Sequence, residues 1–368
     1  MKEKEISAFL SERIAESDFP SAVYLVAEKG EIIFADALGF AVVEPERITA
    51  KSDTIFDLAS LTKPLVTALL CAKLIETGKI NLTDKISKFL PGFESEDKQG
   101  ITIQHLLAHV SGFPAWKPFY LLTDRAENVL RMIASHRLEN PTRTEVIYSD
   151  FNFLTLGFLL EKLYGKRLDE IASVEIFNKL SLTQTFFNPP AAIKNEIAAC
   201  EFGNEYEKQI CRERGIDVEN FAWRDYQIWG EVHDGNCKFL GGASGHAGLF
   251  STAEETLKIA QQFLAEETIL LKPETCELFR TNFTPNLNEA RSLGFQLAAT
   301  KDSTGNGVLA ANSFGHLGFT GTSLWIEPAS KRIFILLTNR THRDLPFVNI
   351  NPIRRRFHEL AVRALNKT

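Results

Sequence analysis

The sequence has few cysteines and no motif that pairs them. The five cysteines, at positions 71, 200, 211, 237 and 276, are odd in number and include no CxxC pair. A disulfide framework or a standard zinc site uses cysteines in even, closely spaced sets. We therefore predict reduced, mostly buried thiols of the kind found in cytoplasmic proteins.

The sequence also lacks a long apolar run. No segment approaches the ~18 apolar residues of a membrane-spanning helix. The best candidate, the apolar run FNFLTLGFLL (151–160), has the length of a buried helix. Residues 1–20 alternate charged and apolar residues at helical spacing, without the apolar region and the small-residue cleavage site of a signal peptide. We expect no membrane partner and a cytoplasmic location.

Positive charge is in deficit. Lys and Arg number 41 against 47 Asp and Glu, which gives a net charge of −6. A nucleic-acid-binding protein needs a clustered excess of basic residues. The one dense basic run, residues 354–356, lies in a helical stretch and is interpreted as a solvated helix face. We predict no nucleic-acid partner.

Strand character is present at both ends of the chain, and helical character lies between them. SAVYLVAEKGEIIFADALGFAV (21–42) predicts a β-hairpin whose turn holds Gly30. Residues 292–338 contain further strands, and a closing helix is predicted over 351–366. Between these ends, helical patterns with glycine or capping residues at their borders cover 60–77, 101–113, 149–165 and 253–267.

This order predicts an α/β (α+β) fold with an antiparallel sheet flanked by helices. Residues 1–78 and 290–368 form a discontinuous α/β domain in this interpretation, and residues 79–289 form a mostly helical insertion. Strands arranged as hairpins, without alternating βαβ units, favour the antiparallel sheet. We find no internal repeat and no low-complexity linker.

The stretch FDLASLTKPLVTALL (56–70) places Ser60 three residues before Lys63 at the start of a predicted helix. Serine is a poor nucleophile without a base, and lysine serves as one only if its pKa falls well below ~10.4. The positive end of a helix favours both a neutral lysine and an oxyanion. The alternative is a serine cap with an incidental lysine. The apolar run after Pro64 favours the chemical interpretation, because it indicates a buried lysine.

Two further short motifs are compatible with a site. Tyr148-Ser149-Asp150 precedes an apolar helix, where the tyrosine can face a pocket or simply pack beside a helix cap. His316-Leu317-Gly318 lies on a predicted strand, where Gly318 would allow a substrate to approach the backbone closely. Either motif alone has little specificity.

In the order S-x-x-K, Y-x-[ND], H-x-G, these motifs resemble those of the class C β-lactamase and DD-peptidase superfamily, which has a β-lactamase/transpeptidase-like fold. The superfamily includes family VIII-type carboxylesterases and branches similar to peptidoglycan-fragment amidases. The resemblance extends over nearly the whole chain, from IFDLASLTKPLVTALL through ITIQHLLAHVSGFP and YSDFNFLTLGFLLEKLYG to GHLGFTGTSLWIEP.

The resemblance implies a role for each matching residue. Ser60 would be the acylated nucleophile, Lys63 would lower its proton affinity, and Tyr148 would be the general base or proton shuttle. The backbone N–H groups of Ser60 and Phe319 would form the oxyanion hole. On the substrate-binding side the resemblance places Asp150, His316 and Gly318. It implies neither a cofactor nor a metal.

Two departures from the family pattern bear on the substrate. Asp150 stands where the β-lactamases of this class carry asparagine, and a carboxylate cannot donate a hydrogen bond to a substrate carbonyl. His316 stands in place of a lysine, which removes a permanent positive charge. Both count against β-lactam hydrolysis and against recognition of a substrate carboxylate.

We therefore predict a serine hydrolase that cleaves short-chain carboxylic esters, with weak or no β-lactamase activity. The alternative is an amidase or DD-peptidase-like hydrolase of peptidoglycan fragments. A catalytically silent penicillin-binding or sensor module is less favoured, because Ser60, Lys63 and Tyr148 are all present. The expected substrate is a small ester or amide, and the oligomeric state stays open.

Several histidines allow a metal site as an alternative. His233, Asp234 and His246 fit no standard zinc spacing, and a polar loop lining a pocket is favoured for them. His105 and His109 have the i, i+4 spacing of a zinc helix but lack the glutamate of H-E-x-x-H, so helix packing is favoured. The absence of a G-x-S-x-G elbow argues against an α/β-hydrolase.

Aromatic residues concentrate around 113–147 and 200–236. They predict either an apolar substrate pocket or a core that anchors loops. The residues concerned are Phe113, Trp116, Phe119, Tyr120, Trp223, Tyr226 and Trp229.

Overall fold

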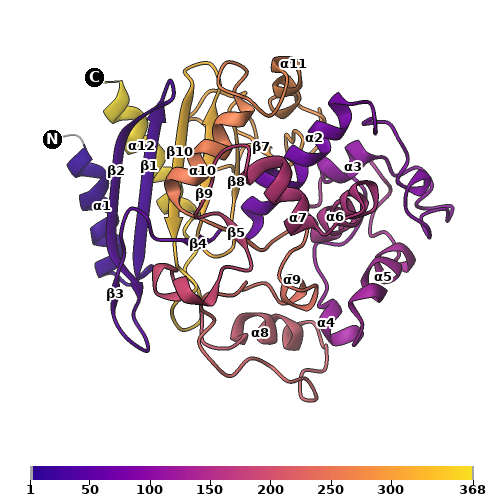
Figure 1. Cartoon of the computed structure of the whole chain (residues 1–368), viewed down its shortest axis with the longest axis horizontal. Coiled ribbons are helices and arrows are strands. Elements are labelled where there is room, and N and C mark those ends of the chain that lie inside the picture. Colours follow the sequence, from indigo (N-terminus) through magenta and orange to yellow (C-terminus); the bar gives the residue numbers. More distant parts are fainter. Residues whose placement is uncertain (1–2, 367–368) are drawn as a thin grey trace.

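A computed structural model describes residues 3–366 and contains a seven-stranded antiparallel sheet in the order β3-β2-β1-β10-β9-β8-β7 (Figure 1). β1 pairs with β10 at its centre, so the two ends of the chain meet in one sheet. The predicted fold class is confirmed. The strands are β1 (Ser21–Glu28), β2 (Glu31–Val42), β3 (Ile48–Thr49), β7 (Gln296–Leu297), β8 (Phe314–Leu317), β9 (Ser323–Glu327) and β10 (Arg332–Thr338).

Both faces of this sheet are buried. Side chains alternate between the faces along a strand, so Val23 and Leu25 of β1 join the large core on one side, whereas Tyr24 and Val26 join a second core on the other. The helices α1 (Glu3–Ala15) and α12 (Asn351–Leu365) cover the second core, and α10 (Ala253–Ala260) packs on β1 and β10 from the opposite side (Figure 1). The sheet therefore lies between two helical layers.

The regular secondary structure in the middle of the chain is largely helical. A small sheet in the order β4-β6-β5 joins it to the N-terminal part, because β4 (Phe56–Asp57) pairs with β6 (Leu249–Ser251), and β6 pairs with β5 (Phe186–Phe187). The division at residues 78/79 and 289/290 stays a prediction. The helices of this region are α2 (Leu69–Glu76), α3 (Ile103–Leu107), α4 (Phe119–Leu122), α5 (Val129–Ser135), α6 (Asp150–Tyr164), α7 (Leu168–Ala172), α8 (Glu205–Glu213), α9 (Gly235–Phe239) and α11 (Pro273–Cys276).

Two predicted helices differ from the structure. The helix expected over 60–77 is a 3₁₀ turn (Ala59–Leu61), a π-helical segment (Lys63–Ala68) and then α2. Wide π turns are frequent at functional sites, and a hydrophobic pattern does not distinguish them from α-helix. The helix expected over 101–113 is only α3, because the backbone turns left-handed at His109 (φ 58°) and Gly112 (φ 87°).

The burial of the thiols agrees with the expectation from the sequence. All five cysteines are buried and form no disulfide. Within residues 3–366, no helix combines the length and the apolar character needed to cross a bilayer.

Candidate active site

Ser60 follows β4 at a strained point of the backbone. Ala59, just before it, has a φ of 47°, a left-handed conformation that costs a residue with a side chain about 1–2 kcal/mol. The buried Asp57 carboxylate accepts hydrogen bonds from the N–H groups of Ala59 and His233, both at 2.8 Å. These bonds hold the turn that presents Ser60 to a cavity.

Lys63 lies one turn further on and is completely buried. Its ammonium group has three N–H donors, and the structure provides three oxygen acceptors. Nζ is 2.9 Å from Ser60 Oγ, 2.8 Å from Asp150 Oδ1 and 3.2 Å from the His246 carbonyl. The predicted pairing of Ser60 with Lys63 is therefore present in the structure.

The charge state of Lys63 follows from these contacts. Burial lowers its pKa, but the Asp150 carboxylate and the Tyr148 hydroxyl outweigh burial and leave the pKa above its ordinary value. The condition under which lysine acts as a base, a lowered pKa, is not met. Lys63 is an ammonium ion that donates to Ser60 Oγ, so another group has to receive the serine proton.

Tyr148 is surrounded by cationic and imidazole side chains. Lys63 Nζ lies 4.8 Å and Arg291 Cζ 5.5 Å from its ring centroid. The rings of His109 and His316 lie 4.7 Å and 5.6 Å away. The Tyr148 hydroxyl is buried and has no hydrogen-bond partner within residues 3–366. Positive charge near this oxygen would stabilise a negative charge developing on it.

The predicted roles of His316 and Gly318 in substrate binding stay predictions. Neither lines the cavity beside Ser60. His316 is buried behind Tyr148, and burial, aided by the charges of Lys63 and Arg291, holds its pKa well below the ordinary value. His316 is therefore neutral.

A glycine is needed at position 318 for a structural reason that the sequence does not reveal. A Cβ atom at this position would lie 1.9 Å from Thr322 Oγ1 and 2.6 Å from the Leu58 carbonyl oxygen. The glycine therefore lets the β8–β9 turn approach the backbone that carries Ser60. The predicted approach of a substrate to Gly318 stays a prediction.

Phe319, in the same turn, does line the cavity. Within residues 3–366, the backbone N–H groups of Ser60 and Phe319 donate no hydrogen bond. An oxyanion needs two such donors. The turn is fixed by Arg354, whose Nη2 donates to the carbonyls of Gly318 and Thr322, each at 2.8 Å.

The position of Arg354 corrects the interpretation of residues 354–356 as a solvated face. Arg354 is 4% exposed, because α12 packs against the sheet and directs this side chain at the β8–β9 turn. Arg355 and Arg356 are largely exposed and pair with Glu359. Only this part of the run is a solvated face.

Ser60 opens into a cavity of about 280 Å³. Aromatic rings and charged side chains both contribute to its wall. The lining residues are Ala59, Ser60, Trp116, Tyr148, Asp150, Tyr206, Glu207, Ile210, Arg214, His233, Asp234, Ala247 and Phe319.

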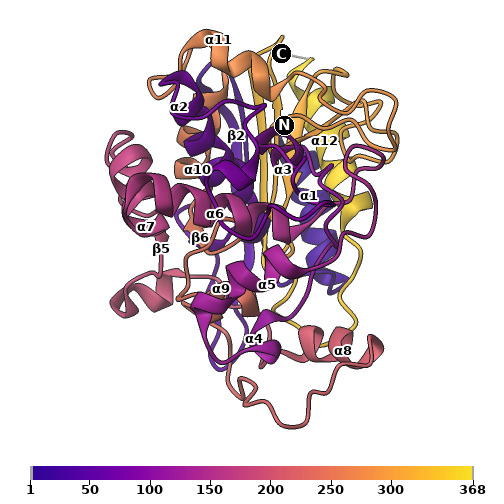
Figure 2. The same cartoon turned by 90° about the vertical axis from the view of Figure 1, so that its right-hand side faces the viewer.

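Glu207 of α8 links this helix to α4 and α9 at the end of the molecule where α4 and α8 lie (Figures 1 and 2). Its two carboxylate oxygens accept from Tyr120 Oη at 2.7 Å and from the Gly235 N–H at 2.8 Å. Burial, with the nearby charge of Asp234, raises the pKa of Glu207 to about 6. α8 and Asp234, which precedes α9, are thereby positioned in the cavity wall.

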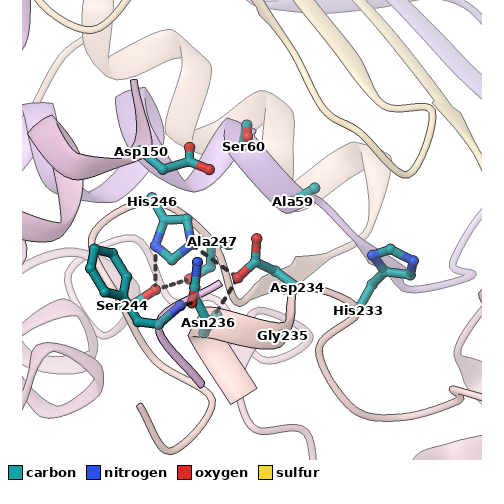
Figure 3. Close-up of polar contacts among 12 residues, drawn as sticks. Ala59, Ser60, Asp150, His233, Asp234, Gly235, Asn236, Ser244, His246 and Ala247 are labelled. Carbon is teal, nitrogen blue, oxygen red and sulfur yellow. Dashed lines mark hydrogen bonds and ion pairs between the residues drawn. The ribbon is translucent and has the colours of Figure 1, made fainter. Parts of the chain in front are cut away.

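The three residues considered for a metal do not converge. His233 turns to Glu201, with Nε2 2.7 Å from Oε1, whereas His246 Nε2 donates to Asp234 Oδ1 at 3.0 Å (Figure 3). A different set, Asp150, Asp234 and His246, has one potential ligand atom each within 4.8 Å of the others. Asp234 thus belongs to the wall beside Ser60, and the buried His246 contacts it.

Packing contacts account for the histidines His105 and His109 and for some of the aromatic residues named from the sequence. His105 Nδ1 accepts from the Thr102 N–H in a capping box, and His109 Nδ1 accepts from the Ser149 N–H, so the two nitrogens serve helix packing. Of the aromatic residues named from the sequence, Trp116 lines the cavity, whereas Phe113 and Phe119 belong to the buried core.

Sequence reasoning missed Tyr206, Glu207 and Arg214. They lie on or just after α8, in a charged stretch that carries no motif. The amphipathic pattern of EYEKQICRE predicts a helix but not the cavity that the helix faces. No signal in the sequence identified these residues.

The comparisons with known proteins agree with this geometry. A family model described as Beta-lactamase matches residues 6–356. A protein of Escherichia coli (strain K12), named "Putative D-alanyl-D-alanine carboxypeptidase", is 30% identical over 361 residues, which cover 91% of this chain and 81% of that protein.

Solved structures show the same fold. EstCE1, described as a hydrolase with promiscuous acyltransferase activity, superimposes with a TM-score of 0.74 at 21% identity, over 97% of this chain and 98% of that one. A class C beta lactamase superimposes with a TM-score of 0.72 at 16% identity, over 100% and 99% of the two chains. The chain belongs to the β-lactamase family and is a serine hydrolase.

Proposed function

We propose that the protein hydrolyses short-chain carboxylic esters of small molecules through an acyl-enzyme on Ser60. The observation that carries this proposal is the Lys63 ammonium, whose N–H donors all have oxygen acceptors and which donates to Ser60 Oγ beside an open cavity. Such a cation stabilises the negative charge that develops on Oγ as its proton leaves.

In the proposed mechanism, Tyr148 as its phenolate takes the Ser60 proton and then, as the phenol, returns it to the leaving alkoxide. The tetrahedral oxyanion accepts hydrogen bonds from the N–H groups of Ser60 and Phe319. Water then attacks the acyl-enzyme with Tyr148 as the base, which regenerates Ser60. Asp150 keeps Lys63 charged throughout.

Two features support an ester rather than a β-lactam or a peptide. Asp150 only accepts hydrogen bonds when ionised and cannot donate to a substrate amide carbonyl. His316 is neutral and lies behind Tyr148, so it offers no positive charge to a substrate carboxylate. An alkoxide also leaves with less help from proton donation than an amine does.

A substrate panel tests this proposal. We expect p-nitrophenyl acetate and butyrate to be turned over at least tenfold faster than nitrocefin and a D-Ala-D-Ala peptide, measured as kcat/KM. A fluorophosphonate should add once to the protein, and peptide mapping should locate the adduct at Ser60. Rapid peptide cleavage with negligible ester turnover would reverse the order of the two candidate functions.

The second candidate is hydrolysis of D-Ala-D-Ala peptides. The names of relatives that are 30–32% identical favour it, and so does the exposed Arg214 on the cavity wall, which can pair with a peptide carboxylate. Arg214 is held at the rim, with Nη1 donating to the Trp116 carbonyl at 3.1 Å. Its guanidinium is thus placed for a carboxylate distant from the scissile bond.

Tyr148→Phe should separate activity from stability. We expect kcat/KM to fall by about 10²- to 10³-fold, because general acid–base catalysis typically contributes this much. The free energy of unfolding should stay equal or rise by about 1 kcal/mol, because the lost hydroxyl is buried without a hydrogen bond. Ester kinetics and urea unfolding measure the two effects, with Tyr164→Phe as the control at the other end of α6. Full activity in Tyr148→Phe would exclude this base.

A further inference from the structure

The wall of the cavity beside Ser60 carries two carboxylates with available oxygens. Asp234 Oδ1 accepts from His246 Nε2 and from the Cys237 N–H, and Asp150 Oδ1 pairs with Lys63. Within residues 3–366, the Oδ2 atoms of both accept no hydrogen bond. The side chains of Asp150 and Asp234 remain 15% and 22% exposed, and both line the cavity.

Asp234 is ionised. Burial raises its pKa, but the His246 imidazole and the Cys237 N–H outweigh burial and hold the pKa well below the ordinary value. Lys63 neutralises Asp150, and Glu207 has both oxygens occupied. Within residues 3–366, no lysine or arginine forms an ion pair with Asp234, whose side-chain partner is the His246 imidazole.

We propose that the acyl part of the substrate carries a primary ammonium next to the scissile carbonyl, bound by Asp234 and Asp150. This inference rests on the proposed acyl-enzyme at Ser60 and narrows its substrate to α-aminoacyl esters and related amides. Two hydrogen bonds, Ser60–Lys63 and Lys63–Asp150, separate the nucleophile from the nearer carboxylate. An amino group on the carbon next to the attacked carbonyl can therefore reach the Asp150 carboxylate.

A metal ion fits this pair of carboxylates less well than an ammonium does. The Lys63 ammonium already occupies Asp150 Oδ1, and its charge repels a second cation of higher charge. His246 directs an N–H at Asp234, whereas a metal ligand has to present a lone pair. One carboxylate oxygen of Asp150 and one of Asp234 lie within 4.8 Å of each other, a separation that an ammonium can bridge with two hydrogen bonds.

The test compares two substrates of matched shape. Alanine ethyl ester, in either enantiomer, carries the ammonium, and ethyl 2-methylpropanoate replaces it with a methyl group. The assay is run at pH 6.5, below the ordinary α-amino pKa of ~7.7, and measures ethanol release. We expect wild type to prefer one alanine ester enantiomer over the methyl analogue in kcat/KM.

Variants separate binding from the intrinsic reactivity of the esters. Asp234→Asn should lower the preference ratio by about tenfold to a hundredfold, because it removes a charge-assisted hydrogen bond. Asp302→Asn, an exposed aspartate outside the cavity wall, changes the net charge equally and should leave the ratio unchanged. A ratio unaffected by Asp234→Asn would overturn the inference.

Further outcomes identify which proposal fails. If Ser60-dependent ester turnover is present but shows no ammonium preference, the inference fails and the proposed function stands. If Ser60→Ala still turns over both esters, the proposed function itself fails. Micromolar binding of Zn²⁺ by calorimetry that Asp234→Asn abolishes would assign the carboxylates to a metal and overturn the ammonium site.

Discussion

Replacing Ser60 with alanine should lower kcat/KM for a p-nitrophenyl ester by about 10⁶-fold, the loss typical when a serine nucleophile is removed. The Ser60 hydroxyl has no substitute in the cavity, because no other serine, threonine or cysteine lines it. Labelling by a fluorophosphonate should disappear completely. Intact mass spectrometry measures the labelling, and stopped-flow or long-time assays measure the residual rate.

Folding of Ser60→Ala should be nearly unaffected. The Ser60 side chain makes one hydrogen bond, to Lys63, and is partly exposed. Ser11→Ala, at an exposed position on α1, is the matched control and should retain wild-type activity and labelling. An unchanged adduct on Ser60→Ala would contradict the assignment of the nucleophile.

Lys63→Met should lower kcat/KM by about 10²- to 10³-fold, because it removes the cation that stabilises the negative charge developing on Ser60 Oγ. The single variant should also lose about 1–3 kcal/mol of unfolding free energy, because Asp150 keeps a largely buried carboxylate without its partner. Ester kinetics and urea unfolding measure the two effects.

A second variant separates these contributions. Lys63→Met with Asp150→Asn removes both charges and should recover most of the stability but not the activity. Lys73→Met is the matched control, since Lys73 belongs to the adjoining α2 and pairs with Glu175 at 3.4 Å, away from Ser60. Activity in the stabilised double variant near that of wild type would show that Lys63 acts only in folding.

Part of the site could be predicted because its signals are local. S-x-x-K spacing brings Ser60 and Lys63 together on any helical turn, and the apolar residues after Pro64 indicate burial. Both features hold in the structure, although the turn is 3₁₀ and π-helical rather than α-helical. The type of helix depends on Ala59 and its hydrogen bond to Asp57, which a periodic pattern does not record.

The charge state of Lys63 could not be predicted in this way. Burial alone lowers a lysine pKa, but Asp150, 87 positions later in the chain, reverses the effect in the folded protein. The close approach of Gly318 to Leu58 likewise joins distant segments and is not visible in the sequence. Arg354 was assigned to solvent for the same reason.

The antiparallel sheet built from both chain ends and the Ser60–Lys63 pair follow from hydrophobic periodicity and local spacing, and the motif order resembles that of the family. The charge of Lys63, the position of His316 behind Tyr148 and the side chains of the cavity wall follow from tertiary contacts. Asp234 and Glu207 reach that wall from loops and helices without a motif. The pKa values of both residues, and the available oxygen of Asp234, depend on contacts that exist only once the chain has folded.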